Sequence, residues 1–165
     1  YVTIGRQLPY KRYDLAVKAC TKLGAELHVF GNGPAHDELV SIAGPTIHFH
    51  TDRFGDASDE AVNNALNTAK GFIYPAEEDF GIVSVEALAA GAPVIGYGRA
   101  GTLDIVTSPE VGELFEHQTV DDVVTAIQQT ESRRFFPSKL NRTARRFDKS
   151  LFLTKIKKIV NDHIS

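Results

Sequence analysis

The chain has 165 residues, of which 42% are hydrophobic and 24% charged, and its formal net charge is −3. These values lie near globular averages and exclude a fibrous or disordered chain, while the length suits one domain with a single core. No apolar run approaches the roughly 20 residues of a membrane-spanning helix, and no signal-peptide pattern opens the chain. The one cysteine, Cys20, lies on an apolar helix face, which predicts a buried thiol in a reducing compartment. We therefore expect a cytoplasmic protein.

Strand-like and helix-like patterns alternate along the chain. Short apolar, β-rich runs predict strands, and apolar residues recurring every three to four positions predict helices. Ser58 is a typical N-cap before Asp59, and Gly91 closes a helix before Pro93. In chain order the predicted elements are strand Val2–Arg6, helix Arg12–Leu23, strand Leu27–Phe30, helix His36–Ala43, strand Ile47–His50, helix Asp59–Ala69, strand Gly71–Tyr74, helix Ile82–Ala90, strand Val94–Gly96, strand Glu113–Phe115 and helix Val120–Thr130.

This order predicts the fold class. Strands that alternate with helices of this length form a parallel sheet, so we expect an α/β, Rossmann-like domain of about six strands with helices on both faces. Two helical runs follow Pro137 with no strand after them, which adds extra C-terminal helices. Residues 1–165 are therefore predicted to be a single domain. Because Tyr1–Ile4 is already strand-like and no Met precedes it, we also expect a segment of the protein upstream of Tyr1.

Charge is unevenly distributed along the chain. Residues 1–130 hold 8 Lys and Arg against 18 Asp and Glu, whereas residues 131–165 hold 10 against 3. A basic segment can contact nucleic acid, anionic lipid or an acidic surface of its own protein. Charged runs on helices are more often solvated faces, so we expect no nucleic-acid partner.

Two loops of the predicted sheet carry unusual residues. Ligands of such sheets bind beyond the carboxyl ends of the strands, where the strand order reverses, and this rule points to the loops after the first and fourth strands. In the first loop, Gly5–Lys11, Arg6 offers a planar fork suited to phosphate and Lys11 a point charge at the start of a helix. Two cations at this edge suit a diphosphate, and ordinary surface charges are the alternative.

The second loop lies in the segment Glu77–Gly91, where three acids follow an apolar strand and a glycine opens a helix. Gly81 lets the backbone approach a ligand, and the free N–H groups of the first helical turn make an anion site. Glu78 can reach sugar hydroxyls, while Glu86, in or just beyond the first turn, can accept hydrogen bonds from a ribose. Carboxylates that stabilise the helix dipole are the alternative, but they do not explain Glu86, whose helix neighbours look buried.

Taken together, these motifs resemble those of one family. Glu78 and Glu86, separated by seven residues and followed by Ala-Leu-Ala-Ala-Gly-Ala-Pro-Val-Ile, resemble the E-x7-E signature of retaining GT-B glycosyltransferases, the glycosyl transferases group 1. That family includes sucrose synthases and many bacterial mannosyl- and glucosyltransferases. Gly5-Arg6 and Lys11 resemble its diphosphate-binding pair. Further matches in the family's order are Phe30–Pro34, Ser58–Glu60 and Gly98–Gly101, so the resemblance covers the whole chain.

The resemblance implies a site for a nucleotide diphosphate sugar. Arg6 and Lys11 would hold the diphosphate and Glu78 would contact the transferred sugar, so these three are the implied catalytic residues. Glu86 would bind the ribose, with the base near Thr51–Phe54 and the configuration at the sugar retained. No metal or other cofactor is implied, because cations and a helix N-terminus neutralise the leaving group. The implied donor-binding residues are Gly5, Arg6, Lys11, Thr51, Arg53, Glu78, Phe80, Gly81, Ile82, Val83 and Glu86.

In one respect the chain departs from the family, because the N-terminal acceptor-binding domain is absent from residues 1–165. Proximity of two bound substrates supplies much of a transferase's rate, so this domain alone should bind donor and turn over little. A nucleotide-sugar-binding module without catalysis is the alternative, and the intact charged residues favour the transferase. The segments Leu8–Asp14 and Ala76–Gly81 look most like mannosyltransferases, which favours GDP-mannose over UDP-glucose as donor.

The resemblance also bears on the basic C-terminal segment. In GT-B enzymes the last helix commonly crosses back to the N-terminal domain, and many relatives act on lipid-linked acceptors at the inner face of a membrane. Packing on the N-terminal domain would pair a few cations and bury apolar residues, whereas membrane contact needs several cations on one exposed face. We favour packing with ordinary solvation and keep peripheral membrane contact as the alternative. The residues that packing would bury are Phe147, Leu151, Phe152 and Ile156.

Two other patterns rank lower. Gly31–His36 follows a strand, as a dinucleotide fingerprint would, but Pro34 and the missing third glycine argue against a dehydrogenase. His48, His50 and Asp52 would share a strand face. A zinc site needs three or four convergent ligands and usually a second shell, so we expect no metal site here.

Overall fold

The computed structural model describes residues 1–51 and 57–164, and the side chains of all of these except residue 164. Six parallel strands form one sheet in the order β3-β2-β1-β4-β5-β6. The predicted Rossmann-like α/β fold is confirmed, with strand boundaries that differ from the predicted ones by at most two residues. The strands are β1 (Val2–Ile4), β2 (Leu27–Phe30), β3 (Ile47–Phe49), β4 (Phe72–Tyr74), β5 (Val94–Tyr97) and β6 (Gly112–Phe115).

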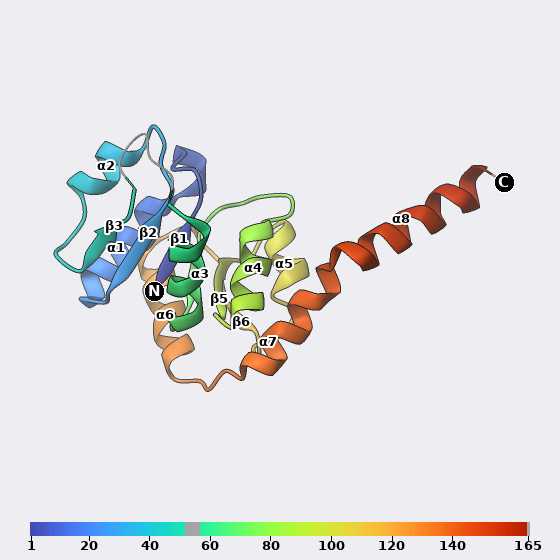
Figure 1. The fold of residues 1–165 in the computed structure, drawn as a ribbon. Helices are drawn as coiled ribbons and strands as arrows, with labels where there is room; N and C mark the ends of the chain where they lie inside the picture. The colour runs from blue at the N-terminus through green and yellow to red at the C-terminus, as the bar shows by residue number, and fades with distance from the viewer. Residues whose placement is uncertain (52–56, 165) are drawn as a thin grey trace.

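Helices cover both faces of the sheet (Figure 1). On one face pack α1 (Tyr13–Leu23), α2 (His36–Ser41) and α6 (Val120–Glu131). On the other pack α3 (Asp59–Thr68), α4 (Ile82–Ala90), α5 (Gly101–Ile105) and α7 (Pro137–Ala144). Two short 3-10 turns, η1 (Pro9–Lys11) and η2 (Arg145–Phe147), and the last helix, α8 (Lys149–Ile164), complete the described chain.

Two hydrophobic clusters follow the alternation of side chains along the strands. Leu27 and Val29 of β2 belong to the cluster under α1 and α6, whereas Phe72 and Tyr74 of β4 belong to the cluster under α3 and α4. Successive strand residues point to opposite faces, so residues two apart enter the same cluster. Burial on both faces is what a covered parallel sheet requires.

Capping residues set the helix ends that were predicted. The Ser58 hydroxyl accepts a hydrogen bond from Ala61 N at 3.2 Å and begins α3, and Gly91 ends α4 with a φ of 94°. The helix α5 was not predicted. It is five residues long and begins after Ala100, whose φ of 47° is unusual for a residue with a side chain, so it shows neither a helical period nor a standard cap.

The strand order reverses between β1 and β4. Val2 of β1 pairs with His28 of β2 on one side and with Phe72 of β4 on the other. From β1 the chain proceeds outward through β2 and β3, then returns to β4 and proceeds through β5 and β6. The loops that leave β1 and β4 therefore lie beside each other at the carboxyl edge of the sheet, which is the usual ligand position in this architecture.

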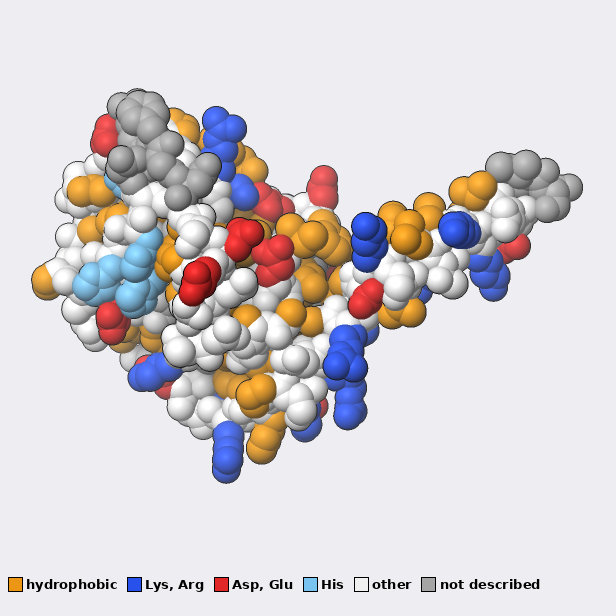
Figure 2. All heavy atoms as spheres, in the orientation of Figure 1, with side chains coloured by type: hydrophobic (Ala, Val, Ile, Leu, Met, Phe, Trp, Pro, Cys, Tyr) orange, Lys and Arg blue, Asp and Glu red, His pale blue; other side chains and the backbone are white. Residues whose placement is uncertain are grey.

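The last helix, α8, extends away from the body of the molecule (Figure 1). Phe152 is 61% exposed, and Leu151 and Ile156 are exposed as well. Apolar and basic side chains lie along its surface (Figure 2). The burial expected for these residues is therefore not provided by residues 1–51 and 57–164. None of the helices described is long and apolar enough to cross a bilayer.

Candidate functional site

Lys11 and Glu78 meet across the point where the strand order reverses. Lys11 ends the turn η1 after β1, and Glu78 lies in the loop between β4 and α4. The Lys11 Nζ lies 2.7 Å from Glu78 Oε1, and the two side chains are only 13% and 22% exposed. The two segments predicted to carry the chemistry are thus joined by a partly buried ion pair.

Two tyrosine hydroxyls complete the surroundings of Glu78. Tyr10 donates to Glu78 Oε1 at 3.1 Å, and Tyr74, at the end of β4, donates to Oε2. Burial acts to raise the pKa of Glu78, but the hydrogen bonds and charge of Lys11 and the two phenols outweigh it and lower that pKa. Glu78 is therefore held as a carboxylate in a fixed orientation.

The loop that carries Arg6 is braced by the loop after β2. Gln7 is fully buried, its amide donates to Gly31 O at 2.6 Å, and its backbone N–H donates to Asn32 O at 2.6 Å. Gly5 and Arg6 leave β1 directly before this anchor. Arg6 itself is exposed; its carbonyl accepts a hydrogen bond from Leu8 N at 2.8 Å, and its guanidinium has no hydrogen bond or ion pair with the side chains of residues 1–51 and 57–163.

The α4 N-terminus lies directly after Glu78. Gly81 is its N-cap with a φ of 75°, a backbone conformation that disfavours residues with a side chain, and no side chain caps the helix. Ile82 and Val83 form the first turn, and Phe80 is exposed beside them. The first backbone N–H groups of this helix lie at the end where an anion is stabilised in general, and the predicted anion site at Gly81–Val83 stays a prediction.

Glu86 lies apart from the Lys11 and Glu78 pair. It is exposed on the second turn of α4 and lines a cavity of about 360 Å³ between α4, α7 and η2, together with Phe80, Arg145 and Phe147. The expectation that its helix neighbours are buried is only partly right, because Ala87 is buried while Val83, Val85 and Ala90 are half-buried. The apolar content of α4 reflects packing against α3, α5, α7 and the sheet, and Glu86 lies on the side that remains exposed.

The loop after β5 supports the Glu78 loop. Gly101 N donates to Glu78 O at 2.9 Å, and a Cβ at Gly101 would lie 2.4 Å from Asp79 O. Its neighbour Ala100 has a φ of 47° and a ψ of −137°, a strained conformation of the kind that clusters at functional sites. The Gly98–Gly101 match therefore has a structural meaning, because only glycine permits this approach.

The predicted base-binding region is described only in part. Thr51 is buried and its hydroxyl donates to Gly31 O, so this side chain holds the β2 and β3 loops together. Arg53, like Asp52 and Phe54, lies outside the described residues. The structure therefore does not bear on the prediction for Arg53.

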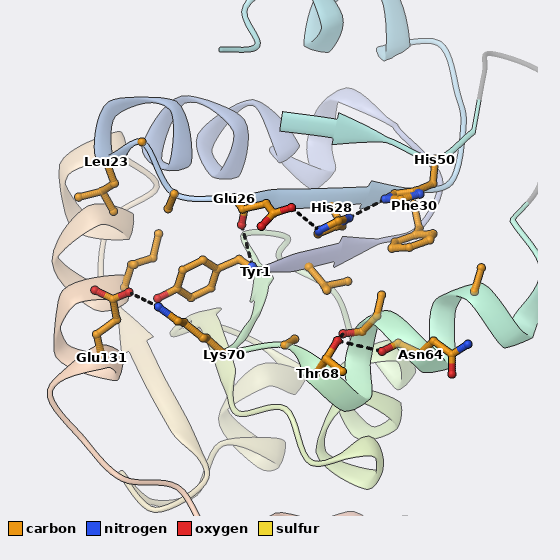
Figure 3. Close-up of a pocket in the computed structure, with 17 residues that line it drawn as sticks. Tyr1, Leu23, Glu26, His28, Phe30, His50, Asn64, Thr68, Lys70 and Glu131 are labelled. Carbon is orange, nitrogen blue, oxygen red and sulfur yellow. Dashed lines mark hydrogen bonds and ion pairs between the residues drawn. The ribbon is translucent and has the colours of Figure 1, made fainter. Parts of the chain in front are cut away.

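A larger cavity lies away from all of these residues. Its volume is about 880 Å³, and it opens at the amino ends of β1 and β2, with Tyr1, the Lys70–Glu131 ion pair and Glu26 around it (Figure 3). The cavity extends to His28 of β2, whose ring stacks on the ring of His50. This cavity lies away from the carboxyl edge of the sheet, which is the usual ligand position in this fold.

Three histidines, His28, His48 and His50, lie close together at the end of this cavity. His28 Nδ1 lies 2.7 Å from His50 Nε2, and His48 Nε2 lies 3.5 Å from Glu26 Oε1. Burial, followed by the charges of His28 and His48, lowers the pKa of His50. No group of three or more side chains suited to a metal ion occurs among the described residues.

Sequence reasoning missed Tyr10, Tyr74 and Gln7. The sequence predicts Tyr74 only as the last residue of a strand, and its hydroxyl gives no signal because its partner, Glu78, follows Pro75 in the next loop. Tyr10 directly precedes Lys11, and its phenol hydroxyl beside a predicted phosphate-binding lysine was the signal that could have found it. Gln7 gave no signal in the sequence, since a polar loop residue that is buried as an anchor is difficult to distinguish from a solvated one.

Comparisons with known proteins agree with this fold. The chain is 25% identical over 165 residues to the sulfoquinovosyl transferase SQD2 of Arabidopsis thaliana, an alignment that covers 94% of this chain and 32% of that protein. It is 32% identical over 145 residues to the GDP-mannose-dependent alpha-(1-6)-phosphatidylinositol monomannoside mannosyltransferase of Mycobacterium tuberculosis, covering 78% and 37%. The chain thus spans about a third of the length of these relatives.

Solved structures show the same architecture. The pneumococcal O-GlcNAc transferase GtfA in complex with UDP and GlcNAc superposes with a TM-score of 0.80 at 21% identity, covering 98% of this chain and 35% of that one. The catalytic domain of cholesterol-alpha-glucosyltransferase from Helicobacter pylori gives a TM-score of 0.67 at 18% identity, covering 93% and 98%. These likenesses show a GT-B-like Rossmann fold. The family model for glycosyl transferases group 1 matches residues 1–147, so the chain belongs to that family.

Proposed function

We propose that this chain is the donor-binding domain of a retaining glycosyltransferase that moves a hexose from a nucleotide diphosphate sugar to a glycan or lipid-linked acceptor. The observation that carries the proposal is the meeting of Lys11 and Glu78 at 2.7 Å where the strand order reverses. A diphosphate needs cations and a hexose needs hydrogen-bond acceptors, and both lie at this one edge of the sheet.

In this proposal each side chain has a defined role. Arg6 and Lys11 bind the diphosphate, helped by the N-terminus of α4 at Gly81–Val83. Glu78 accepts hydrogen bonds from the sugar, and Glu86 from the ribose. Cations aimed at the leaving phosphate stabilise the charge that develops as the sugar departs.

Mannose is the favoured sugar and GDP the favoured nucleotide. Support comes from the likeness of the Lys11 and Glu78 segments to mannosyltransferases and from the names of the mycobacterial relatives, which are GDP-mannose-dependent. The acceptor is proposed to bind a separate N-terminal domain, and without it we expect this domain to be nearly inactive. A nucleotide-sugar-binding module without catalysis is the second candidate.

Calorimetry with a panel of GDP- and UDP-sugars tests donor binding. We expect affinity in the micromolar to millimolar range, because half of the cleft is contributed by the N-terminal domain, and a matching rise in the unfolding temperature. No heat and no thermal stabilisation with any of these ligands at millimolar concentration would contradict the proposal. Turnover by the chain joined to its N-terminal domain distinguishes a transferase from a binding module.

A further inference from the structure

Tyr74 is the last residue of β4 and lies beneath the proposed donor site. It is 1% exposed, and its ring packs on Phe72 with the ring centroids 5.7 Å apart. On the other side, a Cβ at Gly81 would lie 3.1 Å from Tyr74 Cε1, so the start of α4 lies against the ring. The ring is therefore held between a strand and a helix start, and its hydroxyl donates to Glu78 Oε2.

The two oxygens of Glu78 have different kinds of partner. Oε1 is bound by Lys11 and Tyr10, both from the loop after β1. Lys11 has a flexible side chain, and Tyr10 is 55% exposed. Oε2 is bound by the buried hydroxyl of Tyr74 alone among the contacts in the described part of the chain.

Donor binding would change only one side of this arrangement. If Lys11 binds the diphosphate, as proposed, its ammonium is drawn from Glu78 toward the phosphate oxygens, because a diphosphate carries more negative charge than one carboxylate. The Oε1 contacts then weaken while the sugar is being bound. The Tyr74 contact would remain, since its ring is buried between Phe72 and the start of α4.

The protonation state of Tyr74 also suits it to hold the Glu78 carboxylate. Burial, and then its hydrogen bond to Glu78, raise the pKa of Tyr74 well above its usual value, so the phenol stays a neutral donor. A neutral donor orients a carboxylate without cancelling its charge. A cation in place of Tyr74 would instead neutralise the charge of the Glu78 carboxylate.

We propose that Tyr74 is a positioning residue, which holds the Glu78 carboxylate in place for the sugar half of the donor while Lys11 turns to the diphosphate. This inference rests on the proposed function of the site. It assigns Tyr74 no contact with the donor itself.

The test compares Tyr74→Phe with Tyr10→Phe in the 165-residue chain. Each change removes one phenol hydroxyl from Glu78 and keeps the ring, so folding, checked by thermal unfolding, should be retained. Calorimetry is run with GDP-mannose and with GDP, or with UDP-glucose and UDP if wild type prefers them. We expect Tyr74→Phe to weaken the sugar nucleotide about tenfold or more, the range for hydrogen bonds to charged groups, and to leave the nucleoside diphosphate within about twofold. Tyr10→Phe should change both affinities by less than about threefold, because its exposed ring fixes little.

A double-mutant cycle separates positioning from packing. Once Glu78→Gln is made, adding Tyr74→Phe should cause no further loss of sugar-nucleotide affinity. Equal losses for sugar nucleotide and nucleoside diphosphate in Tyr74→Phe, or a full further loss in the double variant, would overturn the proposal. An unchanged sugar-nucleotide affinity in Tyr74→Phe would overturn it as well.

A second readout is independent of the ligand. Carbon NMR of the glutamate carboxyl groups, with Glu78→Gln to assign the signal, follows the titration of Glu78. Removing the Tyr74 hydroxyl should raise the pKa of Glu78, and an unchanged titration would overturn the proposal. If wild type binds neither ligand, the proposed function fails, and this measurement alone still decides whether Tyr74 holds the carboxylate.

Discussion

At the residue scale, the candidate site is organised around one partly buried carboxylate. Glu78 receives hydrogen bonds from Tyr10 and Tyr74 and an ion pair from Lys11. An uncompensated charge in a partly buried position is costly, so Lys11 contributes to stability as well as to the proposed binding. The guanidinium of Arg6, by contrast, is exposed and pairs with no side chain in the described ranges, so we expect it to contribute less to stability than Lys11 does.

This difference predicts how the two cations respond to substitution. Arg6→Ala and Lys11→Ala should each weaken nucleoside diphosphate binding by about 1.5–3 kcal/mol, the range for charge-assisted hydrogen bonds. Arg6→Ala should leave the unfolding temperature unchanged, whereas Lys11→Ala should lower it slightly while the fold survives. Calorimetry and thermal unfolding measure both. Wild-type affinity in both variants would mean that the diphosphate binds elsewhere.

Substitutions of Glu78 and Glu86 should differ in which ligands they weaken. Glu86→Gln is expected to weaken GDP and GDP-mannose alike, because the proposed ribose contact is common to both. Glu78→Gln should weaken only the sugar nucleotide. The position of Glu86, in a cavity beside Phe80 and Phe147 rather than at the ion pair, is consistent with two separate contacts. Equal losses for both ligands in Glu78→Gln would contradict this division of roles.

The lowered pKa of Glu78 predicts a pH dependence of stability. Its folded-state pKa lies below the usual value near 4.5, so its stabilising contribution is present above about pH 4.5 and is lost as the pH falls through the folded-state pKa. The stability difference between wild type and Glu78→Gln should therefore shrink in that acid range. Urea unfolding at a series of pH values measures it. Glu77→Gln, which changes an exposed neighbour, is the control, and the same loss there would contradict the assignment.

At the element scale, the site depends on contacts between loops that follow neighbouring strands. The loop after β5 supports the loop after β4 through Gly101, and the loop after β2 supports the loop after β1 through Gln7. Such loops have no stable conformation of their own, so the sheet that aligns their starting points determines where the charged residues meet.

Gly101→Ala tests the support of the Glu78 loop. The added Cβ would overlap Asp79 O and Phe80 O, at 2.4 and 2.6 Å, and should destabilise the fold by about 1–3 kcal/mol. Because the displaced loop carries Glu78, sugar-nucleotide affinity should fall as well. Gly24→Ala is the matched control, since Gly24 has a φ of 63° with open space around it. It should cost roughly 1 kcal/mol of backbone strain and leave affinity unchanged. A wild-type affinity in Gly101→Ala would show that the support is dispensable.

At the scale of the whole molecule, the C-terminal segment differs from the rest of the chain in its charge and in its exposed apolar side chains. The basic residues concentrate after residue 130, and α8 carries an apolar face that no other described element covers. Phe152, Ile156 and Ile159 lie on one side of the helix at spacings of three and four residues, with Lys155 at its border. Packing on the proposed N-terminal domain would bury this face, whereas a membrane would need its cations.

Vesicle co-sedimentation of this chain joined to the proposed N-terminal domain distinguishes packing from membrane contact. We expect no salt-sensitive binding to anionic vesicles, because packing buries the apolar face and leaves the lysines solvated. Binding to anionic but not neutral vesicles would contradict this expectation if it were abolished by Arg142, Arg145 and Arg146→Glu. Each nearby cation could then contribute about 1 kcal/mol of attraction.

The sequence alone determined the architecture and located the chemistry. Periodicity and capping residues such as Ser58 and Gly91 are local signals, so the six strands and the longer helices were predicted within two residues. The expectation of a parallel sheet, with ligands beyond the carboxyl ends of its strands where the order reverses, then pointed to the loops after β1 and β4. The short α5 lacked such signals and was missed.

Only the tertiary structure decided which side chains meet. Glu78 could have faced solvent, as its sequence neighbours Glu77 and Asp79 do, but the pairing of β1 with β4 brings Lys11 to it, and the buried Tyr74 binds its other oxygen. Glu86, eight residues further on, lines a cavity formed by the packing of α7 on α4, and neither Lys11 nor Glu78 is among the residues that line it. These outcomes depend on contacts between residues distant in sequence, and local periodicity carries no information about them.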